Sequence, residues 1–408
     1  PLGLIGTITD QTKGVVVGAK VAAVNKETSD RREVQTGDTG NYSFVNLIAG
    51  VYRIEVEKTG FAVSTIENIN LRARDIVRVD TTLGVAVIGQ EVKVTEARQV
   101  IATELATIVD TRSNQDIQNL AVGFRAGATN TVYNAISFAP GVQTDRSSGT
   151  PALSIGGGMP FQATASVDGV SSINVRSNGV NTEMFPSTDA VAEMKVSAVS
   201  NNAEYSQAGD ITVTSKSGSN QIHGGAYWNH QNGAFDARDF FANRIGAPFK
   251  ISNDFGFSAG GPILKNRTFF FGDYEALRYR VQSVINSTVP PAAWRTGDLS
   301  SVSTPIVNPA TGIAYPGNKI PITSASSTLL NALYPLPTDS STGIATTNYR
   351  LTAGAKNDND QYDIRVDHIF SEKHNVFGRF SSKDITRSAP LPLFGTLGSD
   401  RTTLDPRN

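Results

Sequence analysis

Three groups of residues have the types that catalysis or ligand binding requires, and the first is a candidate nucleophile. Gly256-Phe257-Ser258-Ala259-Gly260 matches the G-x-S-x-G pattern of a catalytic serine. That pattern needs a strand, a strained turn and then a helix, so that the serine is exposed to its base. Here it lies inside an alternating segment that runs into Gly261-Pro262, where the required helix cannot start. We therefore expect Ser258 to be an ordinary strand residue.

The second and third groups are the histidines and a glycine triplet. No two of the four histidines share the i, i+4 spacing that would bring them together on one helix face. His223 and His230 are an odd number of residues apart on one expected strand, so they should face opposite sides. Gly156-Gly157-Gly158 lacks the lysine and the spacing of a phosphate-binding loop. The sequence thus predicts no metal site, no cofactor and no enzyme. The four histidines are His223, His230, His368 and His374.

The composition indicates a β-rich chain with many turns. The 408 residues include 37 Gly and 11 Tyr, with 39% apolar and 18% charged residues. A net charge of −1 without a basic run argues against a nucleic-acid partner. No run of about 18 apolar residues could form a membrane-spanning helix, but barrel strands alternate and need no such run. Cysteine is absent, which excludes disulfides and thiolate sites. Because the chain begins at Pro1 and stops without a closing element, we expect a processed chain or a fragment.

Residues 1–90 have the pattern of a small β-sandwich. In "GNYSFVNLIAGVYRIEVE", Tyr42 and Phe44 alternate with polar residues, and Tyr52, Ile54 and Val56 alternate with charged ones. Turn residues recur at hairpin spacing. The string G-x-I-x-D, G-A-x-V, D-x-x-G-x-Y-x-F and G-x-Y-x-I-x-V resembles the carboxypeptidase regulatory-like domain. The resemblance implies a transthyretin-like, carbohydrate-binding-like fold without peptidase activity, as a structural module or, alternatively, a glycan-contacting one.

Residues 91–97 form a joint with two interpretations. Val92 and Val94 alternate with Lys93 and Thr95, which is the pattern of a short strand. The segment is either the last strand of the sandwich or a strand that pairs with another protein's sheet edge, through main-chain hydrogen bonds. It resembles the energy-coupling box of TonB-dependent transporters. The candidate residues for binding a TonB-type energy-coupling protein are Glu91, Val92, Lys93, Val94 and Thr95.

Residues 98–220 mix short helices with strands. "TNTVYNAISFAPGV" offers a cap at Asn130 or Thr131 and a helix stopped by Pro140-Gly141. Two short strands and a capped turn running into a further strand follow. The motifs resemble the plug of TonB-dependent receptors, although Gly157 stands where that family has an arginine. These motifs are Pro140-Gly141-Val142, Ile155-Gly156-Gly157, Asp168-Gly169-Val170, the segment 189–196, Ala203-Glu204-Tyr205 and Lys216-Ser217-Gly218-Ser219-Asn220.

Residues 221–408 read as barrel strands joined by tight turns and one long loop. A first strand is expected over 222–231, and about six strands are expected in all. In "DQYDIRVDHIF" the pattern predicts Ile364 and Val366 facing lipid. Asp363 and Arg365 would face the lumen as solvated wall residues rather than ligand contacts. The long loop, with a short helix at "STLLNALYP", belongs on the extracellular side of such a barrel.

Several phrases of this region, including "FSAGGPILKNRTFFFGDYEALR" and "DQYDIRVDHIFSEKHNVFGRF", resemble the Oar-like TonB-dependent receptors. The resemblance implies a mainly β protein: a sandwich, an α+β plug, and an incomplete transmembrane antiparallel β-barrel, since about twenty-two strands close such a barrel. It implies a bacterial outer membrane location with a periplasmic N-terminal domain. The implied partners are a TonB-type protein, membrane lipid and an unidentified extracellular substrate taken up by energised transport. The alternative is a secreted or surface β-rich adhesin.

Overall fold

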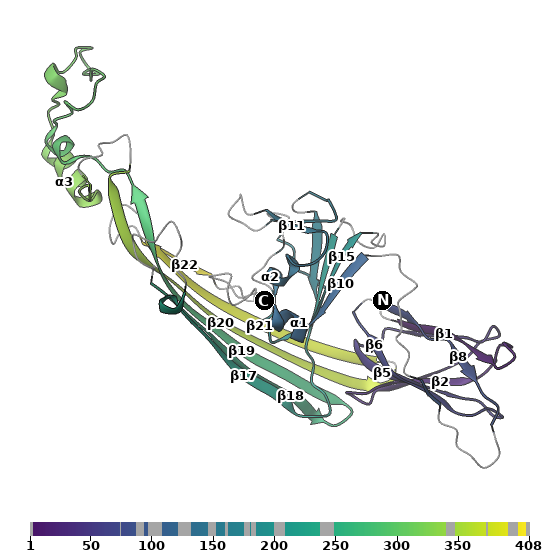
Figure 1. The fold of residues 1–408 in the computed structure, drawn as a ribbon. Coiled ribbons are helices and arrows are strands. Elements are labelled where there is room, and N and C mark those ends of the chain that lie inside the picture. Colours follow the sequence, from purple (N-terminus) through teal and green to yellow (C-terminus); the bar gives the residue numbers. More distant parts are fainter. Residues whose placement is uncertain are drawn as a thin grey trace.

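The chain forms three bodies that follow one another along the sequence. They are a β-sandwich, a central region and a long curved sheet that carries an extended lobe. Figure 1 shows the sandwich at one end of the sheet, the lobe at its other end and the central region against its concave face. None of the described helices is long and apolar enough to cross a membrane. The computed structural model describes residues 3–73, 75–86, 94–96, 108–120, 132–145, 152–159, 162–174, 180, 185–199, 209–236, 249–339, 347–372, 374–390 and 399–404.

The N-terminal sandwich encloses an apolar core between two sheets. Tyr42 and Phe44 are buried, as are Tyr52, Ile54 and Val56, so the predicted alternation is confirmed. The Tyr42 hydroxyl donates to the Val79 carbonyl at 2.7 Å, which satisfies the polar end of a buried ring. One sheet contains β4 (Asn41–Val45), β1 (Gly3–Asp10), β7 (Ile76–Arg78) and β8 (Thr81–Leu83). The other has the order β3 (Arg31–Gln35), β2 (Lys20–Asn25), β5 (Gly50–Glu57), β6 (Ser64–Leu71) and β9 (Val94–Glu96).

The central region, residues 108–215, contains a five-stranded sheet with its own apolar core. The helix predicted before Pro140-Gly141 is present and ends at Ile136, four residues before that proline, whereas its expected caps Asn130 and Thr131 lie outside the described residues. Ser113 and Asp116 form a capping box at the start of α1. The sheet order is β10 (Ile108–Ser113), β15 (Val191–Val199), β16 (Gly209–Ser215), β13 (Ala163–Val167) and β14 (Val170–Ser171); α1 (Asn114–Asn119), α2 (Tyr133–Ile136), β11 (Val142–Asp145) and β12 (Ala152–Ile155) complete the region.

The C-terminal sheet has six antiparallel strands in sequence order, in agreement with the predicted number. Its first strand begins at His223, one residue after the expected start. Two tight turns, at 265–267 and near Glu372, join its strands at the end next to the sandwich (Figure 1). The strands are β17 (His223–Asn232), β18 (Lys250–Leu264), β19 (Thr268–Ser287), β20 (Tyr349–Ser371), β21 (His374–Pro390) and β22 (Ser399–Leu404); a 3₁₀ turn, η2 (Gly233–Phe235), follows β17.

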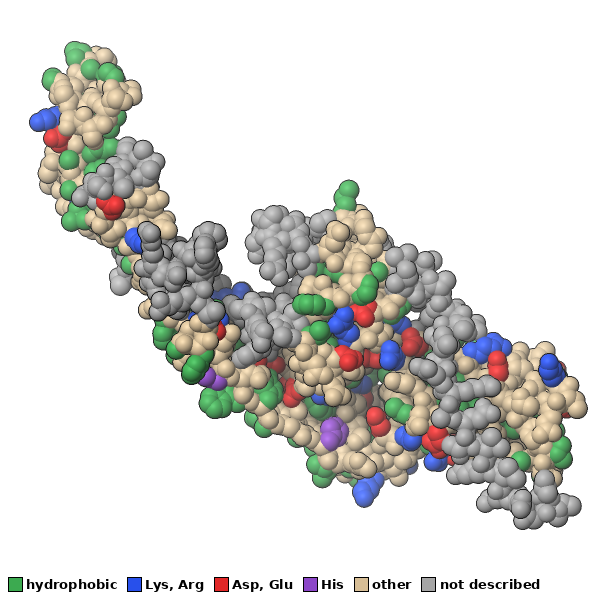
Figure 2. All heavy atoms as spheres, viewed as in Figure 1, with side chains coloured by type: hydrophobic (Ala, Val, Ile, Leu, Met, Phe, Trp, Pro, Cys, Tyr) green, Lys and Arg blue, Asp and Glu red, His purple; other side chains and the backbone are tan. Residues whose placement is uncertain are grey.

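The two faces of this sheet differ in chemistry. Along β20, Ile364 and Val366 point outward and are exposed, whereas Asp363, Arg365 and Asp367 are buried against the central region. Figure 2 shows hydrophobic side chains along the outer margin of the sheet and charged ones where the central region meets it. The predicted alternation of faces is therefore confirmed. Exposed apolar residues of the outer face are Trp228, Phe257, Ile364, Val366, Val376 and Phe380.

The segment between β19 and β20 forms the lobe at the far end of the sheet (Figure 1). It contains the predicted short helix as α3 (Ser324–Leu333), with Thr323 accepting from the Ser326 amide. The Asn348 side chain closes the base of the lobe with two 2.8 Å hydrogen bonds to the Val289 backbone. Two 3₁₀ turns, η3 (Ala292–Thr296) and η4 (Pro316–Asn318), complete it.

The turn Lys216 to Asn220 connects the central region to the C-terminal sheet. A Cβ at Gly218 would lie 2.3 Å from the Phe270 carbonyl oxygen and 2.7 Å from that of Gly261, so only glycine fits there. Contact with β18 and β19 therefore requires the small residue of this motif. The domain limits at 90, 97 and 220 remain predictions.

Candidate functional site

The interface between the central region and the inner face of the sheet contains two polar clusters, and Asp168 is the centre of the first. Asp168 occupies the turn between β13 and β14 with a left-handed φ of 50°, and Gly169 follows at 85°. This conformation directs the carboxylate toward β16, where it accepts the Ser215 amide at 2.9 Å and the Ser215 hydroxyl at 2.8 Å. The Asp168-Gly169-Val170 motif thus provides a fixed, buried acceptor.

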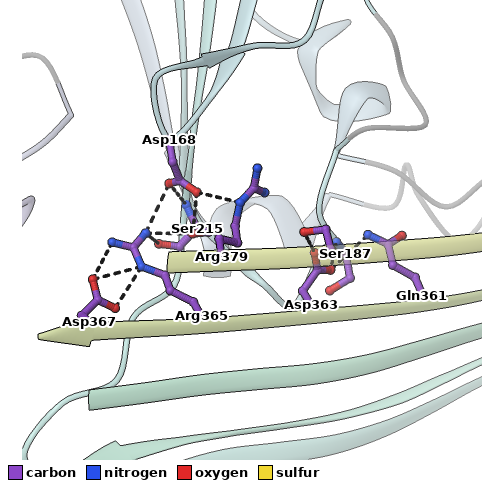
Figure 3. A network of polar contacts seen from close by, with 9 residues as sticks. Asp168, Ser187, Ser215, Gln361, Asp363, Arg365, Asp367 and Arg379 are labelled. Atoms are coloured by element: carbon purple, nitrogen blue, oxygen red, sulfur yellow. Dashed lines mark hydrogen bonds and ion pairs between the residues drawn. The ribbon is translucent and has the colours of Figure 1, made fainter. Parts of the chain in front are cut away.

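Two arginines of the sheet reach this acceptor from neighbouring strands (Figure 3). Arg365 of β20 donates from Nη1 to Asp168 at 3.3 Å and to the Ser215 hydroxyl at 2.8 Å. Arg379 of β21 contacts the other Asp168 oxygen at 3.3 Å. Arg365 also binds Asp367 through Nε at 3.0 Å and Nη2 at 2.8 Å. We call these five residues the Asp168 cluster; its two cations and two anions balance in a site that excludes most water.

The guanidinium of Arg365 is held on a third side by an aromatic ring. Its Cζ lies 4.5 Å from the centroid of Phe377, a cation–π contact that lysine could not reproduce with the same planar stacking. The prediction that Asp363 and Arg365 are solvated wall residues was wrong. Both are over nine-tenths buried because the central region covers them.

Ser187 is the centre of the second cluster, which holds two acids of the sheet. Its amide donates to Asp363 at 3.0 Å and its hydroxyl donates to Asp273. Asp273 and Asp363 are direct cross-strand partners on β19 and β20, so two buried carboxylates share one serine. The Gln361 amide donates to the Phe185 carbonyl at 3.0 Å. It also donates to Asp363 at 3.1 Å, beside Ser187 (Figure 3). We call these residues the Ser187 cluster.

The serine of the G-x-S-x-G motif takes part in the same interface. Ser258 lies within β18, as predicted, and its hydroxyl donates to Asp189 of the central region at 3.1 Å. Gln118 of α1 donates to the other Asp189 oxygen at 2.6 Å. Ser258 is therefore a contact between two bodies in a strand, without the strand–turn–helix geometry of a nucleophile. Among the described residues, no group of three or more His, Asp or Glu side chains could hold a metal ion.

His223 and His230 lie on opposite faces of β17, as predicted. The His223 ring stacks with Phe271, a buried residue of the inner face, with centroids 6.5 Å apart. His230 instead contacts Asn253 of β18 through Nδ1 at 2.8 Å on the outer side.

A third polar contact ties the sandwich to the central region. Lys195 of β15 is buried, and its ammonium lies 2.7 Å from Asp75 and 3.2 Å from the Ala73 carbonyl. The Ala73 amide donates to Glu193 of the same strand at 2.5 Å. Burial raises the pKa of Glu193 above its usual range, against the opposing effect of that amide. We call this contact the sandwich clamp.

The connecting turn, Lys216 to Asn220, also joins the sandwich to the C-terminal sheet. The Asn220 amide nitrogen of the backbone donates to the Glu27 carbonyl at 3.0 Å, and its side chain exchanges hydrogen bonds with Asn266. Burial lowers the pKa of Lys216, partly offset by Asp189 and Asp273. The end of the sheet that carries the tight turns is thus attached to the sandwich.

Only part of the candidate coupling segment lies in the described residues. Glu91, Val92 and Lys93 lie outside them. Val94 and Thr95 belong to β9, which pairs in parallel with Ser64 and Thr65 of β6. The sandwich-strand interpretation is therefore confirmed for these two residues, and binding of a TonB-type protein stays a prediction.

Sequence reasoning identified the motif of Asp168 but not its partners, and it missed the roles of Ser187, Asp189 and Lys195. The available signal for Asp168 was an Asp-Gly pair after a strand, which favours a tight turn. The signal at the sheet was charge at alternate, inward positions of β20. Which inward charge meets which central residue depends on the tertiary fold.

Two protein families match parts of the chain. Residues 214–408 match the outer membrane beta barrel domain, and residues 3–84 match the carboxypeptidase regulatory-like domain. With the fold described above, these matches make the chain similar to one class of protein, the Oar-like TonB-dependent outer-membrane receptors.

Within this class, the chain is similar to the TonB-dependent transporter Oar of Myxococcus xanthus. The two are 28% identical over 298 residues, which cover 70% of this chain and 28% of that relative. Among solved structures it is similar to the siderophore receptor PirA from Acinetobacter baumannii, with a TM-score of 0.40 and 15% identity over 69% of this chain and 32% of that one. The outer membrane transporter YddB from Escherichia coli gives 0.43 and 12% over 70% and 34%.

Proposed function

We propose that this chain is part of a transporter that imports a substrate across the bacterial outer membrane with energy from a TonB-type protein. The observation that carries the proposal is the Asp168 cluster, which holds the central region on the inner face of the barrel sheet. A plug must seal the barrel at rest and leave its place during transport. Polar contacts suit this task, because water can replace each hydrogen bond once the interface opens.

The two ends of the sheet support an orientation. Outer-membrane barrels have short turns on the periplasmic side and longer loops outside. The tight turns at 265–267 lie at the sandwich end, and the lobe that contains α3 lies at the other (Figure 1). We therefore place the sandwich in the periplasm and the lobe outside the cell, where it would meet the substrate first.

Energy would enter through the segment Glu91 to Thr95. In this proposal a strand of the TonB-type protein pairs with the segment and pulls, and the force reaches the central region, which follows it in sequence. Such pairing draws its affinity from main-chain hydrogen bonds. In this proposal, residues 98–220 form the plug and the barrel begins at residue 221.

A single proline substitution in the segment Glu91 to Thr95 tests the proposal. Val94→Pro in the complete protein removes an N–H donor and the extended pairing, so co-purification with the TonB-type protein should be lost. Val94→Ala, the matched control, keeps the backbone donor and should retain it. Both variants should reach the outer membrane in equal amounts. Equal co-purification of the proline variant would overturn the proposal.

The relatives are transporters and receptors, which favours a non-enzymatic role. The adhesin alternative is less well supported, because an adhesin needs neither an apolar outer face on the sheet nor a polar inner face fitted to a central region.

A further inference from the structure

The loop between β4 and β5, residues 46–49, lies where the sandwich, the central region and the C-terminal sheet meet. It lines two cavities, of about 560 and 630 Å³, and Ile48 and Ala49 take part in both. Thr214 of the central region and Arg365 of the sheet also line both cavities. The loop therefore separates two cavities directly beside the Asp168 cluster, at the sandwich end of the interface between the central region and the sheet.

The sandwich holds this loop in one shape. The Arg32 guanidinium donates to the Asn46 carbonyl at 3.1 Å, and the Tyr52 hydroxyl donates to the Ile48 carbonyl at 2.8 Å. The Leu47 side chain is buried in the sandwich core. Because moving the loop alone would expose Leu47 and break both hydrogen bonds, the loop should move only together with the sandwich.

The sandwich is attached to both neighbours of the loop. The sandwich clamp joins it to the central region through Asp75 and Lys195, which lie 2.7 Å apart. The connecting turn joins it to the C-terminal sheet. There the Asn220 amide donates to the Glu27 carbonyl at 3.0 Å, and the Asn220 side chain donates to the Ser29 hydroxyl at 3.3 Å. Both attachments are polar contacts, which water can replace when the sandwich moves.

We propose that the sandwich is a second closure on the periplasmic side of the central region, and that it must detach at the sandwich clamp and at Asn220 before a substrate can leave. This inference rests on the proposed function and adds a release step to it. Cavities of about 300–1,000 Å³ accommodate small-molecule ligands. A substrate that has passed the central region would thus occupy this space while the β4–β5 loop still blocks its exit.

The two attachments distinguish a closure from a flexible appendage. With a single attachment the sandwich could swing about it, whereas attachments to two different bodies hold the loop across the interface between them. In the proposed function the central region moves relative to the sheet. Because the sandwich bridges these two bodies, such a movement must break the sandwich clamp or the contacts of Asn220.

Size-graded labelling of a single cysteine tests the inference, since the chain has no native cysteine. Thr214→Cys, made in the complete protein and studied in lipid nanodiscs, places one thiol in the wall of both cavities. The thiol is labelled with a small methanethiosulfonate or with a maleimide that carries a long polyethylene glycol chain. Asp75→Asn combined with Asn220→Ala loosens both attachments. Asn41→Ala is the matched control, because the Asn41 side chain accepts a hydrogen bond from Thr7 within the sandwich, at 2.7 Å.

We expect the small reagent to label the thiol in every variant. The large reagent should label it at least about tenfold faster in the loosened variant than in the protein with both attachments intact. Asp75→Asn alone should give a smaller increase, and Asn41→Ala none.

Equal labelling by the large reagent in the loosened and the intact protein would overturn the inference. Because labelling requires no TonB-type protein, that result would leave the proposed function standing. Retained co-purification of the Val94→Pro variant would instead refute the proposed function, and the release step with it.

Discussion

Replacement of Arg365 by methionine should loosen the central region from the barrel wall. Methionine keeps much of the side-chain length but removes every donor to Asp168, Ser215 and Asp367. Removing one partner of a buried ion pair costs about 3–5 kcal/mol. Asp168 keeps both Ser215 donors and Arg379, and Asp367 keeps the Ser217 hydroxyl at 2.7 Å, so the low end applies. We expect a loss of about 3 kcal/mol, or roughly 150-fold in the equilibrium for release.

The assay is the urea concentration at which the central region of the complete protein, embedded in outer-membrane vesicles, becomes accessible to protease. Arg278→Met is the matched control, because Arg278 pairs with Asp360 at 2.7 Å in a half-exposed ion pair of the same sheet. That pair should contribute less than about 1 kcal/mol. Arg365→Lys should give an intermediate loss, since lysine keeps the charge but not the planar fork.

A double-mutant cycle with Asp168→Asn separates the contact from general destabilisation. If Arg365 acts through Asp168, the two substitutions should be non-additive by about 1 kcal/mol or more. Additivity within about 0.5 kcal/mol would refute the argument that this pair joins the two bodies.

Three further predictions concern the other contacts. Asp75→Asn should weaken the sandwich clamp by about 2 kcal/mol, a value between those of a surface ion pair and a buried one. Backbone hydrogen exchange at residues 72–76 should become faster, and unchanged exchange would contradict this prediction. The raised pKa of Glu193 means that its contribution to stability is present at low pH and is lost as pH rises through the folded-state pKa. The substitution Glu193→Gln should therefore raise the midpoint temperature of thermal unfolding more at pH 7 than at pH 4. A larger increase at pH 4 would contradict the prediction. Ile364→Arg on the outer face should cost the barrel about 2–4 kcal/mol in lipid and Ile364→Val almost nothing, measured by urea unfolding in vesicles; equal costs would argue against lipid contact.

Local patterns in the sequence predict much of the fold because they depend on near neighbours. Alternation along β4 and β5 correctly assigned Tyr42 and Tyr52 to a sandwich core, and alternation along β20 correctly separated Ile364 from Asp363. A two-residue period indicates which face of a sheet a side chain occupies, because successive residues of a strand point to opposite sides.

The same pattern carries no information about what covers that face. Arg365 and Asp168 are 197 residues apart in sequence, and their contact exists only because the central region packs inside the curved sheet. Inward charges were therefore expected to meet water. Ser187 is a single serine without periodicity, and its bond to Asp363 spans 176 residues. Likewise, alternation at Val92 and Val94 predicts a strand, but it does not state which sheet edge the strand joins.

The central claim is that the six-stranded sheet is a membrane wall whose inner face holds the central region. Single cysteines along β20 of the complete protein, spin-labelled in outer-membrane vesicles, test it most directly. Labels at Tyr362, Ile364 and Val366 should collide with oxygen, which concentrates in lipid, and not with a water-soluble nickel reagent. Labels at Gln361 and Asp363 should be protected from both. Access of the nickel reagent to the outer positions would contradict the account.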